Sequence, residues 1–338
     1  MCLLRAAGGA ARMAQSERQV VEIQCKSLLN RVVSQRMPFR WSINPYRGCE
    51  HKCVYCYARR YHTFLDLDPG SDFENKIFVK VNAPEVLRRE LARPGWQREK
   101  VAIGTAVDPY QPVEGKYRLT RQILEVLLDA ATPCSVVTKN TMVQRDVDLL
   151  QELARGPGCT VSLSLTTLDE DLARRLEPGT PAPRRRLETV GRLARRGIEA
   201  GVMIAPVLPG LTDGPGLERL VDEAFSHGAR FVHWGVLRLD EGVKDVYLDF
   251  IRSEAPRLLP LYGRMYPGAY APAEYVWRID ARMGGKLRAK GGFPEGEEPP
   301  RTALGAAGAL PFERVSRAVD PAGRKRAPLA PVQLQLQF

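Results

Sequence analysis

Short runs of apolar and β-branched residues alternate with amphipathic stretches between about residues 39 and 237. The runs have the length of buried strands, and the stretches between them repeat their apolar positions at helical spacing. This alternation predicts βα units around a parallel sheet. We expect six strands, near residues 40–45, 101–107, 134–138, 160–166, 200–206 and 230–237. Six units predict an α/β fold of the partial (β/α)6 barrel type, since a complete barrel has eight.

The stretches between the strands predict the helices. Pro84 suits the first turn of a helix that runs to Leu91. Apolar positions then recur three and four residues apart near 119–130, 149–153, 187–194 and 217–224. Beyond residue 243 the strand signal fades, and two helical stretches at 243–263 and 272–289 predict a helical C-terminal extension.

Changes in composition divide the chain into three parts. Residues 1–38 are expected to be an N-terminal extension, with Met1 and Met13 both possible starts of translation. Residues 39–290 are expected to form the core and its C-terminal helices. Residues 291–338 are rich in Gly, Pro, Ala and charged residues, which favours a mostly disordered tail.

Hydropathy and charge narrow the class of protein. No stretch approaches the roughly 20 apolar residues of a membrane span, and Arg5 and Arg12 interrupt the only candidate leader. We therefore expect a cytoplasmic protein with no membrane partner. Lys and Arg number 50 against 39 Asp and Glu, a net charge of +11. This excess favours a polyanionic partner such as nucleic acid, although a GC-rich genome also enriches Arg.

Three of the seven cysteines crowd into the run NPYRGCEHKCVYCYARRYH. Cys49, Cys53 and Cys56 have C-x3-C-x2-C spacing, which does not suit a disulfide framework in a chain of this kind. Thiolates of one loop can hold a [4Fe–4S] cluster, and three ligands leave one of its four irons open. A zinc site is the alternative, with His51 or His62 closing the shell as a fourth ligand.

The spacing and its surroundings resemble the radical S-adenosylmethionine (SAM) superfamily. Within it, the chain is most similar to the spore photoproduct lyase-like, DNA-repair-related branch, through the segments NPYRGCEHKCVYCYA, AIGTAVDPYQPVE, VVTKN and LEPGTPAPRRRLETVGRLARRGI. The resemblance spans about residues 39–240. It implies a [4Fe–4S] cluster, SAM and an external electron donor. The reduced cluster would cleave SAM, and the resulting 5′-deoxyadenosyl radical would take a hydrogen atom from the substrate.

The same resemblance implies roles for residues around the cysteines. Tyr55 would pack beside the adenine of SAM. Thr105 and Lys139, at the ends of the second and third expected strands, would hold its carboxylate, although Lys139 could also be a solvated surface lysine. Arg186 is the expected cofactor or substrate contact near Glu177, with a solvated charge run as the alternative.

Tyr110 lies in the loop Asp108-Pro109-Tyr110-Gln111-Pro112-Val113-Glu114, which two prolines stiffen. One interpretation is that the loop contacts cofactor or substrate and that Tyr110 relays a radical. The other is a Pro-rich turn that Asp108 caps. The sequence leaves both open.

One segment departs from the spore photoproduct lyases. Those enzymes carry a cysteine in the strand-two segment, which returns a hydrogen atom to the product radical. Residues 102–106 here read AIGTA, and Cys134 and Cys159 fall on later strands. The resemblance therefore implies the radical machinery without implying the lyase reaction.

The favoured function is a radical SAM enzyme acting on nucleic acid or a nucleotide. Net charge, the branch resemblance and a basic helix near 278–290 support it. The alternatives are a radical SAM enzyme acting on a peptide or small metabolite, and a non-catalytic iron–sulfur binding protein. The basic residues of that helix are Arg278, Arg282, Lys286, Arg288 and Lys290.

Residues 333–338 read QLQLQF, which resembles the short peptide that docks bacterial replication and repair proteins on the sliding clamp. Gln333 would supply a polar anchor while Leu336 and Phe338 fill an apolar pocket. An edge strand that folds back onto the barrel is the alternative.

Overall fold

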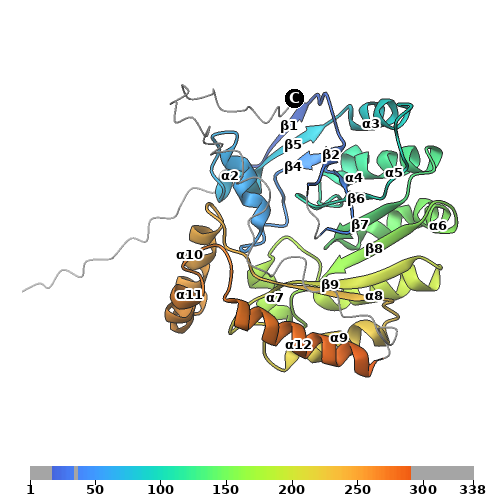
Figure 1. Cartoon of the computed structure of the whole chain (residues 1–338). Coiled ribbons are helices and arrows are strands. Elements are labelled where there is room, and N and C mark those ends of the chain that lie inside the picture. Colours follow the sequence, from blue (N-terminus) through green and yellow to red (C-terminus); the bar gives the residue numbers. More distant parts are fainter. Residues whose placement is uncertain (1–16, 34–36, 291–338) are drawn as a thin grey trace, which may run out of the picture.

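The chain is described by a computed structural model over residues 17–33 and 37–290. A seven-stranded sheet with the order β10-β9-β8-β7-β6-β3-β2 runs through it (Figure 1). Its six neighbouring strands from β10 to β3 are all parallel, and β2 joins the β3 edge antiparallel. The strands are β2 (Asn30–Arg31), β3 (Trp41–Ile43), β6 (Val101–Ile103), β7 (Cys134–Thr138), β8 (Cys159–Ser164), β9 (Glu199–Val207) and β10 (Val232–Val236).

Helices connect consecutive parallel strands and lie along the outer side of the sheet, as Figure 1 shows. They are α3 (Ala83–Leu91), α5 (Leu119–Asp129), α6 (Val147–Arg155), α8 (Pro183–Arg195) and α9 (Gly216–Ser226). Pro84 and Pro183 occupy first turns, where a missing N–H costs nothing. Sequential strand order with helical crossovers confirms the predicted partial α/β barrel.

The first two predicted strands are only half as long as predicted, or less. The strand expected at 40–45 is β3, and the one expected at 101–107 ends at Ile103. Gly104 turns the chain there with φ +90°, and a Cβ at this position would overlap the carbonyl oxygen of Val137 and lie 2.6 Å from Cδ of Pro109. Thr105 therefore lies in the loop after β6 and not at a strand end.

The helix predicted at 243–263 is interrupted. It consists of α10 (Lys244–Glu254), the 3-10 turn η3 (Pro256–Leu258) and α11 (Leu259–Met265). Ala255 has φ −149° and ψ 57° because the following Pro256 excludes the helical region from the residue before it. The second predicted helix is α12 (Ala273–Ala289), which packs along α9.

A second sheet, which the sequence analysis did not predict, has the order β1-β5-β4. It contains β1 (Gln19–Ile23), β4 (Tyr46–Arg47) and β5 (Lys76–Lys80). The segment after β1 is anchored, because the Asn82 side chain bonds both the N–H and the C=O of Cys25. Residues 17–33 therefore form part of the folded core, within the region predicted as an N-terminal extension.

The remaining elements are short: η1 (Tyr57–Arg59), α1 (Arg60–Thr63), α2 (Ser71–Asn75), α4 (Glu114–Tyr117), η2 (Thr141–Asp146) and α7 (Glu170–Leu176). No helix among the described residues is both long and apolar enough to cross a membrane. The predicted tail at 291–338 and the clamp-like residues Gln333, Leu336 and Phe338 lie outside the described residues.

Candidate active site

The three motif cysteines lie on residues 48–57, hereafter the cysteine loop, which follows β3 and β4. Cys49 and Cys53 are each 6% exposed, and Cys56 is half-buried. Gly48 starts the loop with φ +78°, and a Cβ here would lie 3.1 Å from the carbonyl oxygen of Phe73. The loop thus extends from the carboxyl end of the first barrel strand, where chemistry gathers in such folds.

Gln111 holds the start of the cysteine loop. Its buried side chain donates from Nε2 to Gly48 O at 3.1 Å and accepts the Glu50 N–H at 3.0 Å. The Glu50 carboxylate in turn accepts the N–H of Val113 at 2.8 Å. The only signal for Gln111 in the sequence is its place as a polar residue between two prolines. The loop 108–114 therefore supports the cysteine loop directly.

Arg59 holds the other end of the loop and was not predicted. Its side chain is completely buried. Nε donates to the Cys53 carbonyl at 3.0 Å, and Nη2 contacts Glu74 at 2.6 Å. Nη1 reaches the carbonyls of Pro69 and Gly70 at 3.0 and 3.2 Å. A buried arginine with all three nitrogens bonded fixes backbone geometry more than it provides binding energy.

The turn after α7 packs against the middle of the cysteine loop. The N–H of Val54 donates to Leu176 O at 3.0 Å, and the N–H of Gly179 donates to His51 O at 3.1 Å. A Cβ on Gly179 would overlap the carbonyl oxygen of Glu50 and lie 2.8 Å from Cα of His51. Only glycine permits this approach of two backbones.

A buried polar cluster lies behind the loop around Glu177. The Tyr55 hydroxyl donates a short hydrogen bond to Glu177, and Thr166 Oγ1 contacts the same carboxylate at 2.9 Å. Arg186 Nη1 lies 2.6 Å from Glu177 Oε2. Burial raises the pKa of Glu177, but Arg186 and Lys139 more than offset it and lower the pKa to about 2. The carboxylate is therefore ionised at any working pH.

Arg186 is placed behind Glu177. It is 1% exposed, and its other donors bond Pro181 O at 2.7 Å, Ser164 O at 2.9 Å and the Thr180 hydroxyl. These bonds fit a residue that positions Glu177. The predicted direct contact with cofactor or substrate stays a prediction.

Lys139 lies on the open side of this cluster. Its Nζ is 5.7 Å from the centroid of the Tyr55 ring, and its side chain is half-buried. Burial lowers the pKa of Lys139, but Cys53, Glu177 and Cys56 outweigh it and raise the pKa. A permanently charged ammonium therefore faces both the cysteine loop and Tyr55.

Thr105 lies on the other side of the loop, after β6. Its hydroxyl accepts from Asn44 Nδ2 at 3.2 Å, and its carbonyl accepts from the Tyr57 hydroxyl. Asn44 Oδ1 also accepts the N–H of Ala106 at 2.8 Å. The position of Thr105 is thus fixed from both sides at the mouth of the barrel.

Comparisons with known proteins identify the family. The profile of the Radical SAM superfamily matches residues 43–223, more than half of the chain. This chain belongs to the radical SAM superfamily. An uncharacterized protein of Mycobacterium tuberculosis is 41% identical over 265 residues, covering 78% of each chain. The radical SAM Nα-GlyT isomerase of Pseudomonas phage M6 is 23% identical over 247 residues, 71% of this chain and 49% of that one.

Solved spore photoproduct lyases share the fold of this radical SAM protein. One of them superimposes with a TM-score of 0.63 at 16% identity and covers 85% of both chains. Membership of the superfamily implies an enzyme with a [4Fe–4S] cluster and SAM as its cofactors. The reaction is not implied by this membership.

The donor set of the cysteine loop fits that cluster. Among residues 17–33 and 37–290, no three His, Cys, Asp or Glu side chains are placed to hold a metal ion. A [4Fe–4S] cluster instead binds each cysteine through a different iron, so three thiols spread along one loop suit it. Burial raises the pKa of Cys49 to about 12, so cluster assembly must displace its proton.

The two candidate zinc ligands differ in their surroundings. His51 Nδ1 lies 3.2 Å from Asp108 Oδ2, and the His62 ring packs edge-on against Phe73 at 5.2 Å between centroids. Asp108 also accepts from Thr138 Oγ1 at 2.6 Å. His51 thus has a charged partner beside the cysteine loop, whereas His62 packs through its ring and both of its nitrogens are buried without a hydrogen-bond partner among the described residues.

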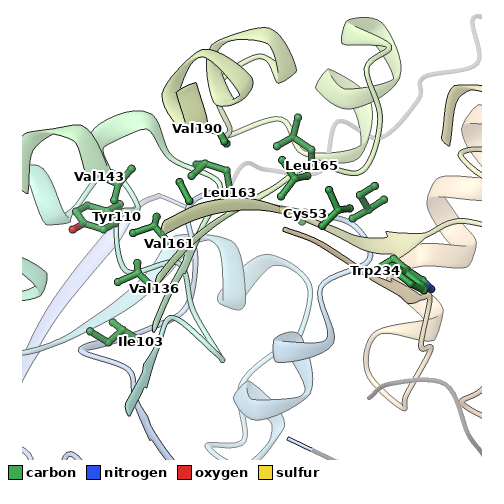
Figure 2. Close-up of a cluster of buried hydrophobic side chains, with 14 of the residues drawn as sticks. Cys53, Ile103, Tyr110, Val136, Val143, Val161, Leu163, Leu165, Val190 and Trp234 are labelled. Carbon is green, nitrogen blue, oxygen red and sulfur yellow. The ribbon is translucent and has the colours of Figure 1, made fainter. Parts of the chain in front are cut away.

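Tyr110 lies in the hydrophobic core together with Cys53 (Figure 2). Its side chain is completely buried, and in Figure 2 its hydroxyl points away from Cys53. The Arg145 guanidinium lies 5.8 Å from its ring centroid. Burial raises the pKa of Tyr110 well above its usual value, and the nearby Asp146 carboxylate raises it further. The structure gives Tyr110 a packing role, and its part in radical transfer stays a prediction.

Proposed function

We propose that this radical SAM enzyme acts on a nucleic acid or a nucleotide. The observation that carries the proposal is positive charge at the barrel mouth. Arg60 and Arg238 both contact the single carboxylate of Asp240, at 3.0 and 2.8 Å, beside the cysteine loop. One carboxylate neutralises only one of the two cations, so the mouth keeps a positive charge that suits a phosphate.

Comparisons and composition support the proposal. The chain carries a net charge of +11. A spore photoproduct lyase, which shares this fold, has been solved with AdoMet and a dinucleoside spore photoproduct. The relative from Pseudomonas phage M6 is named a radical SAM Nα-GlyT isomerase.

Ion pairs to α9 engage three of the five basic residues near 278–290, so the helix supports the proposal with part of its charge. Arg282 pairs with Glu218, and Lys286 and Lys290 lie 2.7 and 2.9 Å from Asp222. These cations therefore attach α12 to α9. Asp222 balances only one of its two lysines, and Arg278 and Arg288 are exposed, so the helix keeps part of its positive charge on the surface.

The cofactors supply the chemistry, which is reductive cleavage of SAM to a radical that takes hydrogen from the substrate. The protein's own residues bind and orient. In this proposal Cys49, Cys53 and Cys56 hold the cluster, while Lys139 and Thr105 hold the SAM carboxylate. Tyr55 packs beside the adenine, and its ring stays in place because its hydroxyl donates a hydrogen bond to Glu177.

The proposal does not extend to the photoproduct lyase reaction. The strand-two segment carries no cysteine that could return a hydrogen atom. Cys134 and Cys159 pair across β7 and β8 with their sulfurs 3.7 Å apart, and both are first residues of their strands. They therefore lie at the amino ends, opposite the cysteine loop.

The test is anaerobic reconstitution with iron and sulfide, followed by reduction with dithionite in the presence of SAM. We expect 5′-deoxyadenosine to form. We also expect single-stranded DNA or RNA to bind with an affinity that falls steeply with salt, since phosphate contacts release counterions. Cleavage of SAM with no nucleic-acid binding at any salt concentration would contradict a nucleic-acid substrate and leave the family assignment intact.

A further inference from the structure

An exposed aromatic face follows the cysteine loop. Tyr57, Tyr61 and Phe64 are spaced at i, i+4 and i+7 along η1 and α1, so they share one side of these turns. Tyr57 is 45% and Phe64 54% exposed, and the rings of Tyr61 and Phe64 lie 6.1 Å apart. Among the described residues only one other aromatic side chain, Trp277, is exposed to this degree. Packing does not explain two such rings on one short segment.

Two arginines border this aromatic face. Arg60 comes from α1 itself, and Arg238 follows β10, the last strand of the barrel. Their side chains are 31% and 16% exposed, and the Asp240 side chain between them is 10% exposed. The Nε of Arg238 is buried without a hydrogen-bond partner among the described residues. The pair therefore has an unused donor as well as an unbalanced charge.

The face lies where the two ends of the partial barrel approach each other. Arg60 and Asp240 join α1 to the loop after β10, and a Cβ on Gly242 would lie 3.6 Å from Cγ2 of Thr63. The Tyr57 hydroxyl donates to the carbonyl of Thr105, after β6. The aromatic face is thus continuous with the mouth that the cysteine loop opens into.

We propose that the aromatic face of Tyr57, Tyr61 and Phe64, together with Arg60 and Arg238, binds a single nucleic-acid strand next to the nucleotide that enters the barrel mouth. The inference rests on the proposed function and assigns its binding surface. Exposed rings stack on bases of any sequence, and arginines beside them take the connecting phosphate. A single strand fits best, because the bases of a duplex are stacked on each other and present no free ring face.

The test uses the reconstituted holoprotein under anaerobic conditions and a short fluorescein-labelled single-stranded oligodeoxynucleotide. Phe64→Ala should weaken binding about 5- to 100-fold, the range for loss of one stacked base. It should leave the binding of an abasic strand of equal length unchanged. Arg60→Met should lower the slope of log affinity against log salt by about 0.7, the value of one single-strand phosphate contact.

Two matched variants serve as controls. Trp277→Ala removes an equally exposed aromatic from α12, and Arg155→Met removes an exposed cation from the end of α6, at the opposite end of the barrel. Both should bind the strand as the wild type does. Cluster absorbance and melting temperature check that each variant is folded.

If Phe64→Ala and Arg60→Met both bind the strand as tightly as the wild type does, the assigned surface is overturned and the proposed function stands. If the wild-type holoprotein binds no strand at low salt, the assigned surface and a nucleic-acid substrate are both overturned. A loss of affinity in Trp277→Ala as large as that in Phe64→Ala would likewise remove the assignment to this face.

Discussion

Glu177 shows how single residues determine the cofactor side of the site. Its carboxylate is 2% exposed, yet it stays ionised because Arg186 lies behind it and Lys139 in front. Tyr55 donates to the same group and keeps its proton, since burial and Glu177 raise its pKa well above the usual value. The ring of Tyr55 therefore has one fixed orientation when SAM arrives.

The three motif cysteines are each expected to be essential. Replacing Cys49, Cys53 or Cys56 with Ala should abolish the cluster absorbance and all reductive cleavage of SAM, because each thiolate binds its own iron. Cys159→Ala is the matched control, since this cysteine is also buried but begins β8. Absorbance spectra measure the cluster, and 5′-deoxyadenosine assays measure the cleavage of SAM. A single motif variant that kept both signals would refute the assignment.

Lys139→Met should weaken SAM binding about 10- to 100-fold while the cluster remains assembled, which is the effect of losing a charge-assisted hydrogen bond of about 1.5–3 kcal/mol. Thr105→Ala should have a smaller effect, because a neutral hydroxyl contributes only about 1 kcal/mol. Equilibrium dialysis of SAM against the anaerobic holoprotein measures both. Lys100→Met, one residue before β6 and at its amino end, is the control. Unchanged affinity in both variants would remove the two residues from the cofactor site.

At the scale of elements, hydrophobic periodicity predicted all six parallel barrel strands and the helices between them. It missed β1, β2, β4 and β5, which are runs of only two to five residues whose strand character comes from the segments they pair with. The cysteines were found because their spacing is local. Gln111 and Arg59 were not, since their roles depend on backbone carbonyls that the fold brings to them.

The close contact between Gly179 and the cysteine loop should make cluster content depend on this glycine. Gly179→Ala should reduce cluster content after reconstitution, because the added Cβ overlaps Glu50 and must push the loop away. Gly214→Ala is the control, as a Cβ there meets nothing within 4 Å. Iron per protein and melting temperature are the measurements. Full cluster occupancy in Gly179→Ala would mean that the loop has room to move without losing iron.

At the scale of the whole molecule, acid should destabilise the fold through His62. The ring is completely buried, and burial lowers its pKa from 6.5 to about 4. The unfolded chain then binds the proton more readily, so stability is present above pH 6.5 and is lost as the pH falls towards 4. The expected loss from this group is about 2 kcal/mol between pH 7 and pH 5.

Urea unfolding at a series of pH values measures this effect, with His62→Leu as the comparison. Leucine fills a similar volume beside Phe73 and does not titrate. The variant should therefore lose about 2 kcal/mol less than the wild type across the same pH interval. Parallel pH profiles for the two proteins would show that His62 is not the group responsible.

The bond between Arg60 and Asp240 has a consequence for biosynthesis. The two residues are 180 positions apart, and Tyr55 and Glu177 are 122 apart. All three motif cysteines leave the ribosome long before these partners do. Contacts of such separation form only after their loops close, whereas neighbouring βα units pair locally and early. A nascent chain therefore holds its cysteine loop only through the nearer contacts of Arg59 and Gln111 until Glu177 and then Asp240 have been made. Complete support for the cluster, and with it iron delivery, belongs after synthesis of the last barrel strand.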